Sequence, residues 1–298
     1  MDYVLLVLVV CMATLKVSLN RNLKSESTTV YGTLKTNLLC FCFAFLTIFL
    51  FGLKDLKAIG NTPFFLSLCL AVCTLGAQIC LMKAIQLGSV AVSALFTYCE
   101  FIIPTLWGAV HYQEEVQVLQ VLGLLMVLAA FVLSTRKETD VKFNKWWFFF
   151  ACGGLLFSGG IGIIQKIFTN EYPNAVLNNF LTVAFAILLI IGGVCLLIVR
   201  RFEKIAQAES ELIKKFNTER WKKIGLIVAL GLLIAIINIV NTYLSGKLPS
   251  VIVFPVINGG SIFASTLMSM IVFKEKLAKR QKIGLTIGVL AIIMIAFA

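Results

Sequence analysis

One acidic residue, Glu100, lies deep in an apolar stretch, 89–111, that is long enough to cross the hydrocarbon core of a bilayer. An ionised carboxylate at the centre of a membrane helix costs roughly 2.5–3.5 kcal/mol on insertion scales, so it should face a cavity or a partner, or be protonated. Glu100 could therefore carry protons or bind a cationic substrate. A neutral, hydrogen-bonded structural glutamate is the alternative.

Polar and small side chains recur every three or four residues along 89–111, which predicts one polar face on the expected helix. They are Ser89, Ser93, Thr97, Glu100, Pro104, Gly108 and His111. A second such face follows 250–273, with Ser250, Asn258, Ser261, Ser265 and Ser269. We expect a shared cavity whose substrate-binding or proton-coupling residues are Glu100, Tyr98, Thr97, Asn258, Ser261 and Ser265. Helix packing through small residues would explain the serines, but not Glu100 or Asn258.

Other polar residues in apolar segments are weaker candidates for the same site. They are Gln78, Lys83, Gln165, Lys166, Asn238 and Asn241. Lysines near helix ends ordinarily extend to the membrane interface, and asparagines can simply join helices by hydrogen bonds. Lysines that faced the cavity would favour anionic substrates, whereas a lone acid favours protons, cations or amines.

Two further acids, Glu114 and Glu275, lie at expected helix boundaries. A negative charge is favourable near a helix N-terminus. We expect them to cap the helices that begin near 117 and 283.

Membrane helices must position these residues, because 60% of the chain is hydrophobic and only 13% is charged. Soluble domains carry about 25% charged residues. Apolar runs and polar breaks predict ten spanning segments: 3–19, 34–52, 63–82, 89–111, 117–134, 146–166, 175–199, 223–243, 250–273 and 283–298. No basic stretch precedes the first run and no clear cleavage site follows it, so we expect a retained helix rather than a signal peptide.

The basic residues are distributed unevenly between the two sets of loops. Of the 26 Lys and Arg, 20 lie in the loops after the first, third, fifth, seventh and ninth segments, and four lie in the opposite set. The positive-inside rule then places loops 136–145, 200–223 and 274–282 in the cytoplasm and both termini outside it. The net charge of +12 thus sits in loops, and we expect no nucleic-acid binding. The expected location is the plasma (inner) membrane, as a multi-pass protein.

Cysteine and histidine usage argues against a metal centre or an enzyme. The nine cysteines fall in apolar runs without metal-ligand spacing, and there is one histidine. We expect no cofactor and no metal. Signatures of hydrolases, metalloproteases and P-loop proteins are missing from the sequence, so the prediction is that this is not an enzyme.

An internal repeat appears when the chain is offset by 161 residues. Residues 87–130 then match 248–291 at 11 of 44 positions, including Glu114 with Glu275 and Gln120 with Gln281. Five helices per repeat is an odd number, so the second repeat would enter the membrane inverted. We predict an all-α membrane protein of ten helices in two inverted five-helix repeats, 1–135 and 145–298. Such repeats are typical of secondary transporters.

The repeated segments resemble the EamA-like members of the drug/metabolite transporter superfamily. The resemblance rests on residues 84–92 (AIQLGSVAV) with Pro104, Glu114 and 120–123 (QVLG), and on 273–277 (FKEKL) with 281–284 (QKIG). It implies two inverted five-helix repeats and export or exchange of small metabolites, without identifying a substrate. Ten-helix members usually keep both termini in the cytoplasm, whereas the charges here favour the reverse, and we follow the charges.

The leading hypothesis is a secondary transporter that works by alternating access and is coupled to protons or another gradient, since no ATP-binding motif is present. The alternatives are a flippase for a lipid-linked substrate, a channel or structural membrane protein and, last, a membrane-embedded enzyme. The expected partners are membrane lipids, a small-molecule substrate and a second copy in a homodimer.

Overall fold

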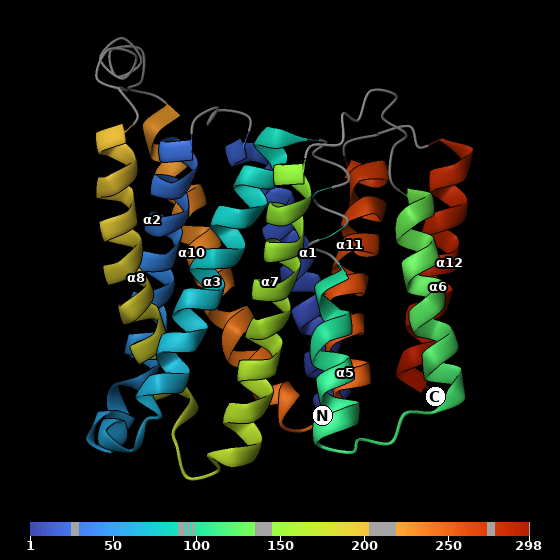
Figure 1. Ribbon diagram of the computed structural model, residues 1–298, viewed down its shortest axis with the longest axis horizontal. Coiled ribbons are helices and arrows are strands. Elements are labelled where there is room, and N and C mark those ends of the chain that lie inside the picture. The colour runs from blue at the N-terminus through green and yellow to red at the C-terminus, as the bar shows by residue number, and fades with distance from the viewer. Residues whose placement is uncertain are drawn as a thin grey trace. The chain divides into compact units, whose positions relative to one another are not determined.

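The computed structural model describes residues 1–24, 30–88, 93, 96, 99–134, 145–202, 219–272 and 278–297. Within these residues the chain forms ten α-helices, two 3-10 helices and no strand (Figure 1). The predicted all-α fold class is therefore confirmed. The ten-helix prediction is also confirmed, except that the predicted segment 89–111 contains a 3-10 turn.

The helix labels follow Figure 1. The α-helices are α1 (Asp2–Lys24), α2 (Val30–Gly52), α3 (Phe64–Leu87), α5 (Ile102–His111), α6 (Val118–Ser134), α7 (Lys145–Glu171), α8 (Leu177–Phe202), α10 (Glu219–Ser245), α11 (Ser250–Val272) and α12 (Lys279–Phe297). The 3-10 helices are η1 (Leu53–Asn61) and η2 (Cys99–Phe101).

Most of these helices have the length and composition of membrane spans. Eight helices in the described residues are long and apolar enough to cross a bilayer, and α6 is a shorter apolar helix of 17 residues. Lipid offers the backbone no hydrogen bonds, so an apolar chain crosses it as helices that satisfy their own N–H and C=O groups. The chain is an integral, multi-pass membrane protein.

The segment around Glu100 departs from the expected structure. We expected one helix over 89–111 with Glu100 at its centre, but Glu100 lies in the 3-10 turn η2, and the α-helix that follows begins only at Ile102. Pro104 supplies the reason. Proline has no N–H to bond the carbonyl four residues earlier, which is that of Glu100, and its ring crowds that carbonyl. The backbone at Glu100 is therefore not held in a regular α-helix.

The chain divides into two compact units, each built from several segments. The first contains Met1–Leu15, Val72–Pro173 and Val240–Ala298, and the second contains Lys16–Ala71 and Asn174–Ile239. In the second unit α2 packs along α8, and Asn179 donates a hydrogen bond of 2.8 Å to the carbonyl of Asp55 in η1. The first unit holds the residues of functional interest.

In the first unit α6 and α12 lie side by side, at the right of Figure 1. A Cβ at Gly123 of α6 would lie 3.2 Å from the carbonyl oxygen of Ala291, and one at Gly284 of α12 would lie 2.9 Å from that of Ala130. The 161-residue offset relates Gly123 to Gly284 and Ala130 to Ala291, so the two contacts are reciprocal. Reciprocal contacts of this kind are compatible with the predicted inverted repeat, which stays a prediction.

Candidate substrate cavity and the adjoining ion pair

A cavity of about 60 Å³ lies within the first unit. Its lining comes from η2, α5, α7, α10 and α11: Glu100, Pro104, Ser158, Ile161, Gly162, Gln165, Asn241, Phe254 and Asn258. The space exceeds what one water needs. Two of the leading candidates, Glu100 and Asn258, thus line one cavity, together with the weaker candidates Gln165 and Asn241.

Glycines on α7 allow the walls of this cavity to approach one another. A Cβ at Gly162 would lie 2.9 Å from Pro104 Cβ and 2.9 Å from Phe254 Cε1. A Cβ at Gly159 would lie 2.6 Å from Ile103 Cβ. Real Cβ atoms do not come this close, so larger residues would push α7 away from α5 and α11. The α7 glycines therefore allow the close helix packing in which Gln165, Glu100 and Asn258 line one cavity.

The buried amides of the cavity are short of hydrogen-bond partners. Within the described part of the chain, neither Nε2 nor Oε1 of Gln165 has a partner, and neither has Oδ1 of Asn241. Gln165 is only 1% exposed. Most buried polar groups are hydrogen-bonded, and an unmade bond costs about 1–3 kcal/mol. These atoms have almost no area accessible to water, so their hydrogen bonds are unmade among the described residues in this conformation.

The other sequence candidates are placed elsewhere or lie outside the described residues. The Ser261 and Ser265 hydroxyls donate to backbone carbonyls of their own helix, those of Asn258 and Ile262. Asn238 likewise donates to its own helix, at 2.8 Å. Gln78 and Lys83 are half-buried on α3 and do not line the cavity. Thr97 and Tyr98 are not among the described residues.

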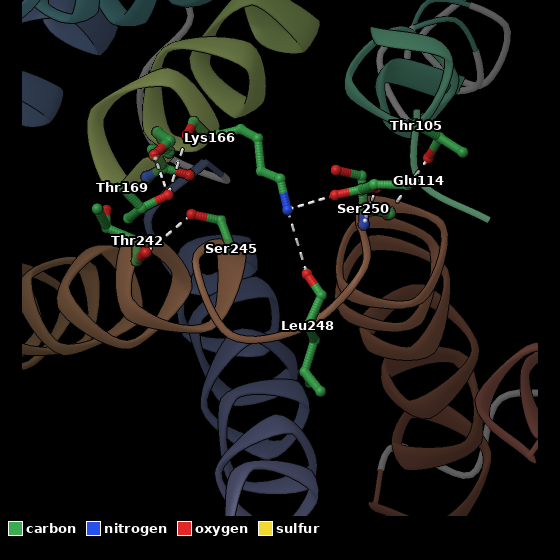
Figure 2. Close-up of polar contacts among 9 residues, drawn as sticks. Thr105, Glu114, Lys166, Thr169, Thr242, Ser245, Leu248 and Ser250 are labelled. Carbon is green, nitrogen blue, oxygen red and sulfur yellow. Dashed lines mark hydrogen bonds and ion pairs between the residues drawn. The ribbon is translucent and has the colours of Figure 1, made fainter. Parts of the chain in front are cut away.

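Lys166, next to Gln165 on α7, is neither at the cavity wall nor extended to an interface. It is buried, and its Nζ lies 2.5 Å from Glu114 Oε1 and donates to the carbonyl of Leu248 at 3.4 Å (Figure 2). Adjacent residues on a helix point about 100° apart, so Lys166 and Gln165 reach different surroundings. The expectation that a lysine near a helix end extends to the membrane interface is therefore wrong for Lys166.

Glu114 is a helix cap, but not of the helix that we expected. Its Oε2 accepts a 2.7 Å hydrogen bond from the backbone N–H of Ser250, the first residue of α11 (Figure 2). At the start of α6 the capping side chain is instead that of Gln120, whose Oε1 accepts a hydrogen bond from the N–H of Gln117 at 3.1 Å. Gln281 accepts the N–H of Ala278 at the same distance before α12. Glu275 lies outside the described residues.

A second polar group gathers where α5 and α7 end. The Tyr112 hydroxyl donates to Glu171 Oε1 at 3.0 Å, and His111 Nε2 lies 3.9 Å from the same oxygen. Burial, followed by the Glu171 carboxylate, raises the pKa of Tyr112 to about 12. The hydroxyl therefore remains protonated at neutral pH and keeps donating. His111 and Glu171 are exposed, so this group is a surface contact rather than a second cavity.

Comparison with known proteins supports the sequence-based resemblance. Residues 2–136 match the model of the EamA-like transporter family. Among solved structures 28 chains match. One, described as "Crystal structure of protein", superposes with a TM-score of 0.72 over 96% of this chain and 94% of its own, at 15% identity. That similarity shows a shared fold. No curated protein matches the chain. The match over residues 2–136 confirms the predicted resemblance to the EamA-like transporter family and indicates a membrane transporter.

Proposed function

We propose that this protein is a secondary transporter that moves a small organic metabolite by alternating access, in export or exchange across the plasma (inner) membrane. The observation that carries the proposal is the cavity that Glu100 lines together with Gln165, Asn241 and Asn258. These residues come from both halves of the sequence. In transporters with inverted repeats, the substrate site is formed by both repeats in this way.

The energetics of the cavity favour a transport role over a structural one. Polar groups inside a membrane protein are expensive, and a purely structural set would satisfy its own hydrogen bonds. Gln165 is buried with both polar atoms unpartnered among the described residues. A site that exchanges water for substrate needs such groups, because the ligand completes their bonds.

The repeats supply the mechanism in this proposal. Residues 1–135 and 145–298 form the two five-helix repeats, and one moves against the other around the cavity. The α6–α12 contact, where Gly123 and Gly284 each meet the opposite helix, joins the two repeats closely enough to guide such movement.

The first experiment identifies a substrate and then tests the mode of transport. Purified protein is screened by thermal shift against amino acids, amines, nucleosides and sugar phosphates, and each binding compound is tested for counterflow in proteoliposomes. A transporter exchanges labelled substrate faster when unlabelled substrate is present inside. Flux that is indifferent to internal substrate would instead indicate a channel and contradict alternating access.

The second experiment separates the two roles that Glu100 could have. Glu100→Gln is nearly isosteric, so packing should change little, and Glu171→Gln makes the same substitution at an exposed site. If Glu100 carries protons, its variant loses pH-driven uptake and keeps exchange. If it binds a cationic substrate, affinity falls at every pH. Wild-type uptake and pH response in Glu100→Gln would exclude Glu100 from the mechanism.

A further inference from the structure

The ion pair of Glu114 and Lys166 lies just beyond one end of the cavity, where α5, α7 and α10 finish and α11 begins. The cavity residues nearest to this end, one on each of these helices, are Pro104, Gln165, Asn241 and Phe254. Beyond each of them the same chain continues into the surroundings of the ion pair. A route between the cavity and this end of the first unit therefore passes the ion pair.

On α5 and α11 the ion pair lies one helical turn beyond the cavity. Gly108 is four residues after Pro104, and Ser250 is four residues before Phe254. The Ser250 N–H donates to Glu114 Oε2 at 2.7 Å. A Cβ at Gly108 would lie 2.5 Å from both Glu114 Oε2 and Ser250 Oγ, so α5, the carboxylate and α11 are in contact. No space for a solute remains between these two helices at this level.

Lys166 spans the distance from α7 to the start of α11. Its side chain extends to Glu114 and to the carbonyl of Leu248, which lies in the connection between α10 and α11 (Figure 2). In the same connection, a Cβ at Gly246 would lie 2.7 Å from Thr169 Cβ on α7. The ion pair thus links three chain segments that are far apart in the sequence, across the end of the cavity.

The backbone after α5 holds Glu114 in this position. Gln113 has a φ of 51°, in the left-handed region that residues other than glycine rarely adopt, and it is the one such residue in the described part of the chain. The N–H of Glu114 then donates to the carbonyl of Gly108 at 3.3 Å. Conformations of this kind persist where surrounding contacts hold them, and they gather at functional and switching sites.

A buried ion pair suits a contact that breaks and re-forms. The desolvation of two charges offsets much of their attraction, and water that enters on separation hydrates both charges again. The free energies of the joined and separated states can therefore lie close together. Glu114 belongs to the proposed first repeat and Lys166 to the second, so movement of one repeat against the other changes the distance between them.

We propose that the Glu114–Lys166 ion pair is the outer gate of the cavity: it is formed while the cavity is closed to the outside, and it separates when the cavity opens there. The outer assignment follows the basic residues, which predict loops 112–117, 172–176 and 246–249 to lie opposite the cytoplasmic loops. The inference rests on the proposed function, since alternating access requires each side of the cavity to close in turn.

Thiol labelling of a cavity residue tests the gate. Ser158 lines the cavity and precedes Lys166 by about 12 Å along α7, at about 1.5 Å per residue. The full chain, with Ser158→Cys and without its nine native cysteines, is produced in cells. The measurement is the rate at which a small, membrane-impermeant methanethiosulfonate added outside intact cells labels this cysteine. The same rate is measured in inverted membrane vesicles.

The principal variant is the double substitution Glu114→Gln/Lys166→Met. It removes the ion pair without changing the net charge, so attraction or repulsion of a charged reagent stays the same. We expect it to raise the labelling rate from outside at least tenfold, without a rise in inverted vesicles. Lys166→Met alone should do the same, and it decides the question if the double variant does not fold. Thermal unfolding of the purified protein shows which variants are folded.

Trp147→Phe is the control for general loosening. It removes a buried hydrogen bond near the other end of α7, that of the indole N–H with Ser93 Oγ at 2.9 Å. The labelling rate from outside should stay within twofold of that of the parent chain. A tenfold rise in this control would show that labelling follows instability, and would overturn the gate.

Two other results would also overturn the inference. Equal labelling rates with and without the ion pair would show that it does not close the cavity. A rise confined to inverted vesicles would place the ion pair on the cytoplasmic side, against the outer assignment. Labelling needs no substrate, so these results are independent of the counterflow experiment, which decides the transporter proposal by itself.

Discussion

Replacing Glu114 by glutamine should destabilise the protein by leaving the ammonium group of Lys166 buried without its carboxylate. The two side chains are 6% and 14% exposed, so water screens them little. Removing one partner of a buried ion pair costs about 3–5 kcal/mol, mostly because the other charge remains uncompensated. The glutamine amide oxygen can still accept the Ser250 N–H, so this substitution tests the charge rather than the cap.

The reverse substitution, Lys166→Met, should cost less. The remaining Glu114 carboxylate keeps the Ser250 N–H and lies at the positive end of α11, an arrangement worth up to about 2 kcal/mol when partly buried. We therefore expect a loss of about 1–3 kcal/mol for Lys166→Met, after that compensation is subtracted from the cost of a lone buried charge. The double variant should lose less unfolding free energy than the two single variants lose together, and the difference, the coupling energy, should be about 2 kcal/mol.

The assay is reversible unfolding of the purified protein by SDS in mixed micelles, followed by tryptophan fluorescence, for wild type, both single variants and the double variant. Glu171→Gln serves as a control, because that carboxylate is exposed and its loss should change stability by less than about 0.5 kcal/mol. A coupling energy below about 0.5 kcal/mol, or a greater loss for Lys166→Met than for Glu114→Gln, would refute the reasoning.

Three further predictions concern packing, anchoring and orientation. Gly284→Val should lower unfolding free energy by about 1–3 kcal/mol, because its side chain would meet a carbonyl of α6 at 2.9 Å; Gly193→Ala, with open space at its Cβ, should have no such effect. Trp147→Phe should cost about 1 kcal/mol in the same assay, since the buried indole N–H donates to Ser93 Oγ at 2.9 Å, and a neutral result would discount that bond. Lys145→Cys, in a background without other cysteines, should react with an impermeant maleimide only from the cytoplasmic side, and labelling from outside intact cells would reverse the charge-based orientation.

The sequence was informative about the helices because their cause is local. An apolar run near 20 residues long has few options in a bilayer other than a helix, so nine of the ten predicted segments each correspond to one helix of the structure. The remaining segment was mispredicted at Glu100, although Pro104 was a usable signal, since its missing N–H acts on the carbonyl four residues before it.

The candidate site could be predicted only in part. Glu100 and Asn258 were recognisable because polar residues stand out in apolar helices, and both line the cavity. Gln165 and Asn241 were indistinguishable in sequence from Asn238, which bonds its own helix instead. The difference depends on how each helix is rotated toward its neighbours, and a list of residues does not contain that rotation.

By itself, the sequence determined that this is a multi-pass helical membrane protein that resembles EamA-like transporters and has an acid in an apolar segment, because hydrophobicity and short motifs act within one segment at a time. Only the tertiary structure decided that Lys166 pairs with Glu114, that Glu114 caps α11 rather than α6, and that Gln165 faces the cavity. The physical reason is close packing. Close approaches such as that of Gly162 to Pro104 fix the distance and rotation between helices that are far apart in the chain. This distance and rotation determine which polar side chains come into contact.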